Sequence, residues 1–259
     1  MKVPARQSDR SPVDQNPDPA VLYPDVATHG SMAAALNAAA AEQGSSLAAE
    51  AAPADPLLHA TVASVLPHRE AMHLAAWPSK RGWSVSGSAN NGVLLLGFTS
   101  DLNEVAEAAL GWAEGTGLDQ IGRAAPFDVL TGRFEVPDGN AADVIESEWR
   151  WMLEEARKAE WPEFRALVEA VYAEPALRRF FPYTSHWALG FATAPDLPFD
   201  TPGFVSVDSP VGEGEYTVRE WWDGPVLAQA RTPGEAVGAA VELVPSALMQ
   251  QSAHVAPEG

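Results

Sequence analysis

The window of residues 178–187, RRFFPYTSHW, holds the densest set of reactive side chains in the chain. Histidine titrates near neutral pH, so His186 is the side chain best suited to act as a catalytic general acid or base. If residues 184–192 form one strand, alternation places His186 on a face paved with small residues, where a groove could admit a ligand. The small residues of that face are Thr184, Ala188 and Gly190. Thr184 and Tyr183 would then donate hydrogen bonds to a substrate. The alternative is a histidine that caps a helix or bonds a backbone carbonyl, because no partnered nucleophile is identifiable.

Two more side chains could contact a substrate. Arg178 is a cation in an acidic chain and could orient a carboxylate, although at a helix C-terminus it would equally meet the helix dipole. Trp151 points away from the apolar stripe of its predicted helix and could line a groove, unless it belongs to a second core layer. The predicted site therefore has His186 as the catalytic residue, and its substrate-binding residues are Tyr183, Thr184, Arg178 and Trp151.

A metal site is not expected. His68 and His73 lie five residues apart, so in a strand their side chains point to opposite faces, and helical spacing brings them together no better. The sequence contains no cysteine. That excludes disulfides, thiolate nucleophiles and cysteine-ligated zinc or iron–sulfur clusters.

The charge balance points to the class of partner. With 35 acidic and 16 basic residues, the chain has a formal net charge of −19. Such a field repels phosphate backbones and anionic lipids and attracts cationic peptides, amines or basic proteins, although acidic surfaces also serve solubility alone. Residues 1–19 lack the apolar run of a signal peptide, and no stretch approaches the roughly 20 apolar residues of a membrane helix. We expect a cytoplasmic protein that binds neither nucleic acid nor membranes.

No cofactor is expected either. The sequence lacks a glycine-rich phosphate loop followed by Lys-Ser/Thr, a dinucleotide fingerprint, a G-x-S-x-G elbow and an H-E-x-x-H helix. The glycines of residues 111–117, GWAEGTG, follow a predicted helix instead of joining a strand to a helix. We interpret them as a helix stop.

Composition divides the chain into segments. Residues 1–19 are rich in charge and proline and predict a disordered arm, and residues 246–259 predict a flexible tail. Residues 20–56 form an alanine-rich helical lead-in with a helix predicted over 31–43. Residues 57–245 are expected to form an α+β domain, as one body or as two packed halves near 57–140 and 141–245.

The predicted elements follow from periodicity and turn residues. Between residues 59 and 98, short apolar runs separated by turns indicate an antiparallel meander, with Asn-Asn-Gly at 90–92 as a hairpin signal. A helix begins after Asp101, which could cap it reciprocally with Glu104. Central helices are predicted at 142–158, 163–173 and 176–181. A second antiparallel strand group and a C-terminal helix after Thr232 complete an α+β fold.

Several segments resemble an uncharacterised actinobacterial family of natural-product biosynthesis proteins that contain a domain of unknown function. These segments are GFTSDLNEVAEAALGWAEG, PFDVL, ESEWRWML and EPALRRFFPYTSHWALGF. The resemblance implies a context that includes ribosomally made peptides, and it carries over no catalytic residue. One hypothesis is a cofactor-independent enzyme that tailors or cyclises a precursor peptide or small-molecule intermediate. The other is a non-catalytic acidic binding, immunity or scaffold protein that covers a basic partner.

Overall fold

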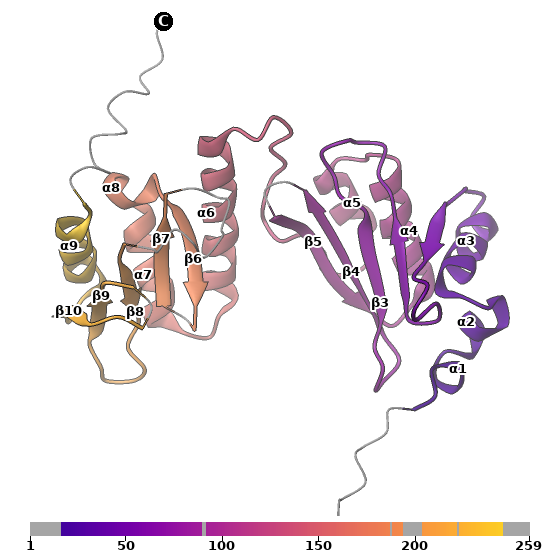
Figure 1. The fold of residues 1–259 in the computed structure, drawn as a ribbon, viewed down its shortest axis with the longest axis horizontal. Coiled ribbons are helices and arrows are strands. Elements are labelled where there is room, and N and C mark those ends of the chain that lie inside the picture. Colours follow the sequence, from indigo (N-terminus) through magenta and orange to yellow (C-terminus); the bar gives the residue numbers. More distant parts are fainter. Residues whose placement is uncertain (1–16, 90–91, 187, 194–203, 222, 246–259) are drawn as a thin grey trace, which may run out of the picture. The chain divides into compact units, whose positions relative to one another are not determined.

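The structure is a computed structural model that describes residues 17–89, 92–186, 188–193, 204–221 and 223–245. Its described residues form helices and two antiparallel five-stranded sheets, which confirms the predicted α+β class (Figure 1). The chain divides into two compact units. The first comprises residues 1–88 and 95–130, and the second comprises residues 89–94 and 131–259. Most of the predicted arm and all of the predicted tail lie outside the described residues.

The first sheet contains the expected meander, with its strands side by side in chain order, and adds β1, which lies in the segment predicted as a helical lead-in. Its strands are β1 Ala49–Ala51, β2 His59–Val62, β3 Met72–Ala76, β4 Trp83–Ala89 and β5 Gly92–Thr99. Burial alternates along β3 and β4, so that Met72, Leu74, Trp83 and Val85 are buried while the residues between them are not. This period of two is what a sheet with one covered face requires.

Helices of the first unit precede and follow this sheet. They are α1 Pro19–Leu22, α2 Pro24–His29, α3 Met32–Glu42, α4 Leu102–Ala113 and α5 Leu118–Ala124. The alanine-rich segment contributes α3, which is capped by Ser31 and packs against α4. Asp101 caps α4, but the predicted reciprocal cap is wrong: the Glu104 carboxylate accepts a hydrogen bond from the Thr99 hydroxyl instead. Thr99 lies nearer because the strand ends directly before the helix.

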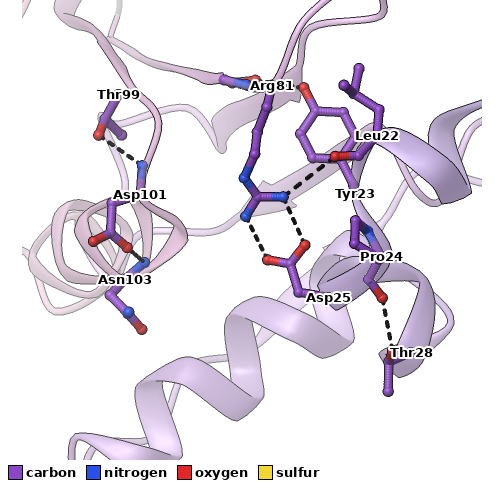
Figure 2. Close-up of polar contacts among 10 residues, drawn as sticks. Leu22, Tyr23, Pro24, Asp25, Thr28, Arg81, Thr99, Asp101 and Asn103 are labelled. Atoms are coloured by element: carbon purple, nitrogen blue, oxygen red, sulfur yellow. Dashed lines mark hydrogen bonds and ion pairs between the residues drawn. The ribbon is translucent and has the colours of Figure 1, made fainter. Parts of the chain in front are cut away.

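Tyr23 fastens α1 and α2 to the hairpin between β3 and β4. Its side chain is fully buried, and its hydroxyl lies 2.8–3.0 Å from the carbonyl oxygens of Trp77, Lys80 and Gly82. The Gly82 N–H donates to the hydroxyl oxygen of Tyr23. Beside it, Arg81 makes a bidentate ion pair with Asp25, shown in Figure 2, and the hydrogen bond from Arg81 lowers the pKa of Asp25.

Replacing Tyr23 by phenylalanine is expected to lower the free energy of unfolding by about 1–3 kcal/mol, the cost of a lost buried hydrogen bond and unpaired partners. Urea unfolding would measure the loss. Tyr216→Phe is the matched control, because that hydroxyl makes one hydrogen bond of 3.2 Å, to the Glu163 carbonyl. An equal loss in both variants would contradict the anchoring role of Tyr23.

The second unit packs helices against one face of the second sheet (Figure 1). Its helices are α6 Ala141–Lys158, α7 Pro162–Tyr172, α8 Pro175–Arg178 and α9 Pro233–Leu243. Its strands, in the order β10-β9-β8-β7-β6, are β6 Phe181–Ser185, β7 Ala188–Ala192, β8 Ser206–Asp208, β9 Tyr216–Arg219 and β10 Val226–Ala230. The predicted C-terminal helix is confirmed as α9, and Thr232 and Glu235 form a capping box at its start.

The predicted helix over 176–181 and the predicted strand over 184–192 are both wrong in extent. Helix α8 ends at Arg178, and Pro182 disfavours helical backbone at Phe181, so the helix does not extend through the predicted range. The indole N–H of Trp149 then donates to the carbonyl oxygens of Arg178 and Phe180, at 2.7 and 3.2 Å. Strand β6 follows at once, so residues 181–192 form a hairpin instead of one strand.

Candidate functional site

The structure places His186 in the turn between β6 and β7, not on a strand face. Ser185 pairs with Ala188, which leaves two residues to close the hairpin. Hairpin turns of this length favour positive φ, and His186 has φ +50°. Its side chain is exposed, and its Nδ1 lies 3.2 Å from the Ser185 hydroxyl. The predicted strand-face position of His186 is therefore wrong, because the chain reverses where the strand was expected to continue.

Tyr183 and Thr184 lie on opposite faces of β6. Tyr183 is directly opposite Gly190 and covers it with its ring, and partial burial raises the pKa of its hydroxyl. Thr184 is exposed and lies opposite Leu189, on the other face. The predicted common face of Thr184 and Gly190 is therefore wrong. One ligand on one face of the sheet would meet Tyr183 or Thr184, but not both.

Arg178 is bound to groups of its own unit. Its guanidinium donates to the Glu146 carboxylate at 2.8 Å and lies 4.2 Å above the ring of Tyr172. The Tyr172 hydroxyl donates to the other oxygen of Glu146. Burial together with Glu146 raises the pKa of Tyr172, and the hydrogen bond to Glu146 raises the pKa of Arg178. This arrangement connects α6, α7 and α8, so the contacts of the Arg178 side chain are structural.

Trp151 is also part of the packed interior. Its half-buried ring borders the main hydrophobic cluster, and the guanidinium of Arg133 lies 4.0 Å from the ring centre. Arg133 in turn makes a bidentate pair with Glu148, at 2.7 and 2.9 Å, and donates to the Val93 carbonyl. The Trp151 ring thus covers one side of a largely buried ion pair. This agrees with the alternative that Trp151 belongs to a second core layer.

The His68 and His73 window lies in the first unit and has a structural role. Arg69, between them, is buried, with its guanidinium 4.6 Å from the ring of Trp112 and 2.8 Å from the Thr116 carbonyl. His73 stands on the exposed face of β3. Over the described part of the chain, no three His, Asp or Glu side chains are grouped so that they could hold a metal ion.

The five predicted site residues are therefore not brought together around one substrate. A different feature of the second unit does have the character of a binding surface. Strand β10 is an edge strand on which Val226 and Leu227 are 49% and 45% exposed, and Trp221, in the loop before it, is 39% exposed. We define Trp221, Val226 and Leu227 as the β10 patch. The exposure of Trp221 could not be predicted from the sequence.

The loop that carries Trp221 is internally fastened. The Glu220 N–H donates to the Pro225 carbonyl, and the Gly224 N–H donates to the Trp221 carbonyl. Arg219 donates to the Gly224 carbonyl at 3.1 Å and pairs with Asp208 at 2.6 Å. The Trp221 ring lies against Gly224, where a β-carbon would come within 3.0 Å of it. An exposed tryptophan in a fastened loop loses little conformational freedom when a partner binds.

A β-bulge makes the patch more prominent. Val226 lies opposite Arg219 and Ala228 opposite Val218, so Leu227 is an additional residue in β10. Such a bulge re-aims side chains at sheet edges. No segment within the described residues pairs with the outer edge of β10, and this edge therefore presents backbone donors and acceptors beside apolar side chains.

Two exposed carboxylates lie in the loop of the β10 patch. Glu220 and Asp223 lie in the same loop as Trp221 and are exposed. Glu213 is also exposed, but it precedes β9, whose first residue pairs with Ala230 at the other end of β10. No ion pair joins any of these three to another described residue, while Glu215 is paired with Arg231 at 3.5 Å. The local potential is therefore negative, and it favours a cationic ligand over an anionic one.

Part of the chain is similar to a known protein family. Residues 143–255, from within α6 through α9 and beyond, match DUF6193, a family of unknown function. The β10 patch and the hairpin with His186 lie inside this domain, whereas the first unit lies outside it. No curated protein and no solved structure matches the chain. No helix of the described residues is both long enough and apolar enough to cross a membrane.

Proposed function

We propose that the second unit binds an extended, positively charged peptide, which adds a strand to the free edge of β10. The observation that carries this proposal is the β10 patch: Trp221, Val226 and Leu227 exposed on an edge strand beside carboxylates without ion-pair partners among the described residues. In strand addition, main-chain hydrogen bonds supply affinity and side-chain contacts supply specificity. Apolar residues of the peptide would contact the patch, and basic residues would face Glu220 and Asp223.

The resemblance to natural-product biosynthesis proteins supplies a context for this activity. The peptide would be a ribosomally made precursor or an intermediate derived from it, held for tailoring or cyclisation without a redox cofactor. A chain without cysteine suits the reducing cytoplasm. Binding is favoured over catalysis by this chain itself, because His186 stands exposed in a hairpin turn and not on a strand face.

Fluorescence anisotropy with a labelled peptide tests the proposal. The peptide alternates lysine and valine over about six residues, the usual length of a strand. Trp221→Ala and Leu227→Ala should each weaken binding by about tenfold or more, as anchors of an interface do. Val211→Ala is the matched control, since Val211 is an 86% exposed apolar residue of the same unit outside the patch.

Two further arms separate this function from its alternatives. A peptide with N-methylated backbone amides should lose most of its affinity, because it cannot pair with β10. Equal binding of the N-methylated and unmodified peptides would refute strand addition. The His186→Ala variant should bind the peptide with wild-type affinity. A loss of affinity as large as that of Trp221→Ala would instead indicate that the peptide binds at the β6–β7 turn. A folded basic protein that binds while the peptide does not would favour the immunity or scaffold hypothesis.

A further inference from the structure

A second candidate site lies in the first unit, in a cavity between α4 and α5. The cavity has a volume of about 190 Å³. Its apolar floor is made by buried Ala108 and Ile121 together with Gly111, where the two helices approach each other closely. This volume is below the range of about 300–1,000 Å³ that is usual for ligand pockets, so only a small ligand would fit.

Two carboxylates flank this floor. Glu107 and Glu114 line the cavity from the same helix face as Gly111, at a spacing of four and then three residues. Both are exposed, and no ion pair connects either one to another described residue. Thr116 and Gln120 add polar groups to the rim. Glu114 also caps the C-terminal end of α4, where the helix dipole adds negative potential.

We propose that this cavity binds a linear aliphatic diamine. Seven residues of helix separate the backbone positions of Glu107 and Glu114 by about 10 Å, a span that two flexible glutamate side chains can close onto the ends of a short alkyl chain. Each ammonium group carries three donors and remains protonated at neutral pH, so each can meet one carboxylate. The alkyl chain covers Ala108, Gly111 and Ile121, which removes apolar surface from water.

The charge and shape of the cavity select against other small molecules. A neutral diol of equal length has the same alkyl contacts but no ion pairs, and a monoamine reaches one carboxylate only. An anionic ligand would meet repulsion from both glutamates and from the helix end. This site is independent of the β10 patch, which belongs to the other unit.

Titration of the ¹⁵N-labelled full chain with 1,5-diaminopentane, followed by NMR, tests the proposal. Saturable shifts of the Gly111, Thr116 and Gln120 amides are expected, with a Kd of about 1 mM at low ionic strength, because the ion pairs are partly solvated. Glu107→Gln and Glu114→Gln should each weaken binding by about three- to fivefold. Pentylamine should bind more weakly than the diamine by a similar factor, and 1,5-pentanediol should produce no shifts at these amides.

The double variant Glu42→Gln with Glu50→Gln is the control, because it changes the net charge of the first unit equally at exposed sites outside the cavity. Its binding should match the wild type. Equal weakening in this control and in the double variant Glu107→Gln with Glu114→Gln would overturn the proposal in favour of diffuse attraction. Tighter binding of Nα-acetyl-lysine methylamide than of the diamine would also overturn it and assign the cavity to a lysine side chain.

Discussion

Replacement of Glu148 by alanine is expected to lower the free energy of unfolding by about 3–5 kcal/mol, the cost of leaving one buried charge unpaired. The side chains of Arg133 and Glu148 are only 11% and 8% exposed. Without Glu148, the Arg133 guanidinium would remain between the Trp151 ring and the Val93 carbonyl with its charge uncompensated. Urea unfolding followed by circular dichroism would measure the loss.

The same helix provides the control for this prediction. Glu154 forms an exposed pair with Arg157 at 3.6 Å, and Glu154→Ala should cost less than about 1 kcal/mol, as exposed pairs do. The double variant Arg133→Met with Glu148→Leu should recover much of the stability, because it removes both charges and keeps the volume. If Glu148→Ala lowers the free energy of unfolding no more than Glu154→Ala does, the Arg133–Glu148 pair does not stabilise the second unit.

Substitution of Gly190 by alanine is expected to destabilise the protein by about 1–3 kcal/mol, the usual cost of overpacking. A β-carbon at this position would lie 2.5 Å from Cζ and 2.7 Å from the hydroxyl oxygen of Tyr183, so the ring must move away from the strand opposite. Gly190 therefore allows the close packing of an aromatic ring across β6 and β7.

A double-mutant cycle would isolate this contact. The combined variant Tyr183→Ala with Gly190→Ala should be more stable than the sum of the single losses implies, because the smaller side chain removes the clash. Gly238→Ala is the control of opposite sign. That glycine lies in α9 with open space where a β-carbon would be added, so alanine should stabilise the helix by about 0.5–1 kcal/mol. Additive losses in the cycle would refute the contact.

Two of the helices could be predicted from short sequence patterns alone. The apolar stripe at 142–158 and the capping box at Thr232 predicted α6 and α9 closely, because both signals lie within a few turns of the chain. The meander was predictable for the same reason, since its hairpins join neighbouring runs. Helix α5 and strand β6 were missed, since α5 has only seven residues and β6 contains a proline.

The candidate site was less predictable than the fold. The expectation for His186 depended on a single strand, and one tight turn was enough to change which residues share a face. Arg178 and Trp151 were sensible ligand contacts by residue type, but Glu146 and Arg133 occupy them. These partners lie 32 and 18 residues away along the chain, a separation that no local pattern reports.

The sequence by itself determined the α+β class, the central and C-terminal helices, and the acidic character that favours cationic ligands. Each of these depends on composition or on neighbours along the chain. Only the tertiary structure decided that Arg133 and Glu148 are buried together, and that Trp221, Val226 and Leu227 are exposed on an edge strand. Burial and exposure depend on which distant segments pack against a residue, and this information is absent from any short stretch of sequence.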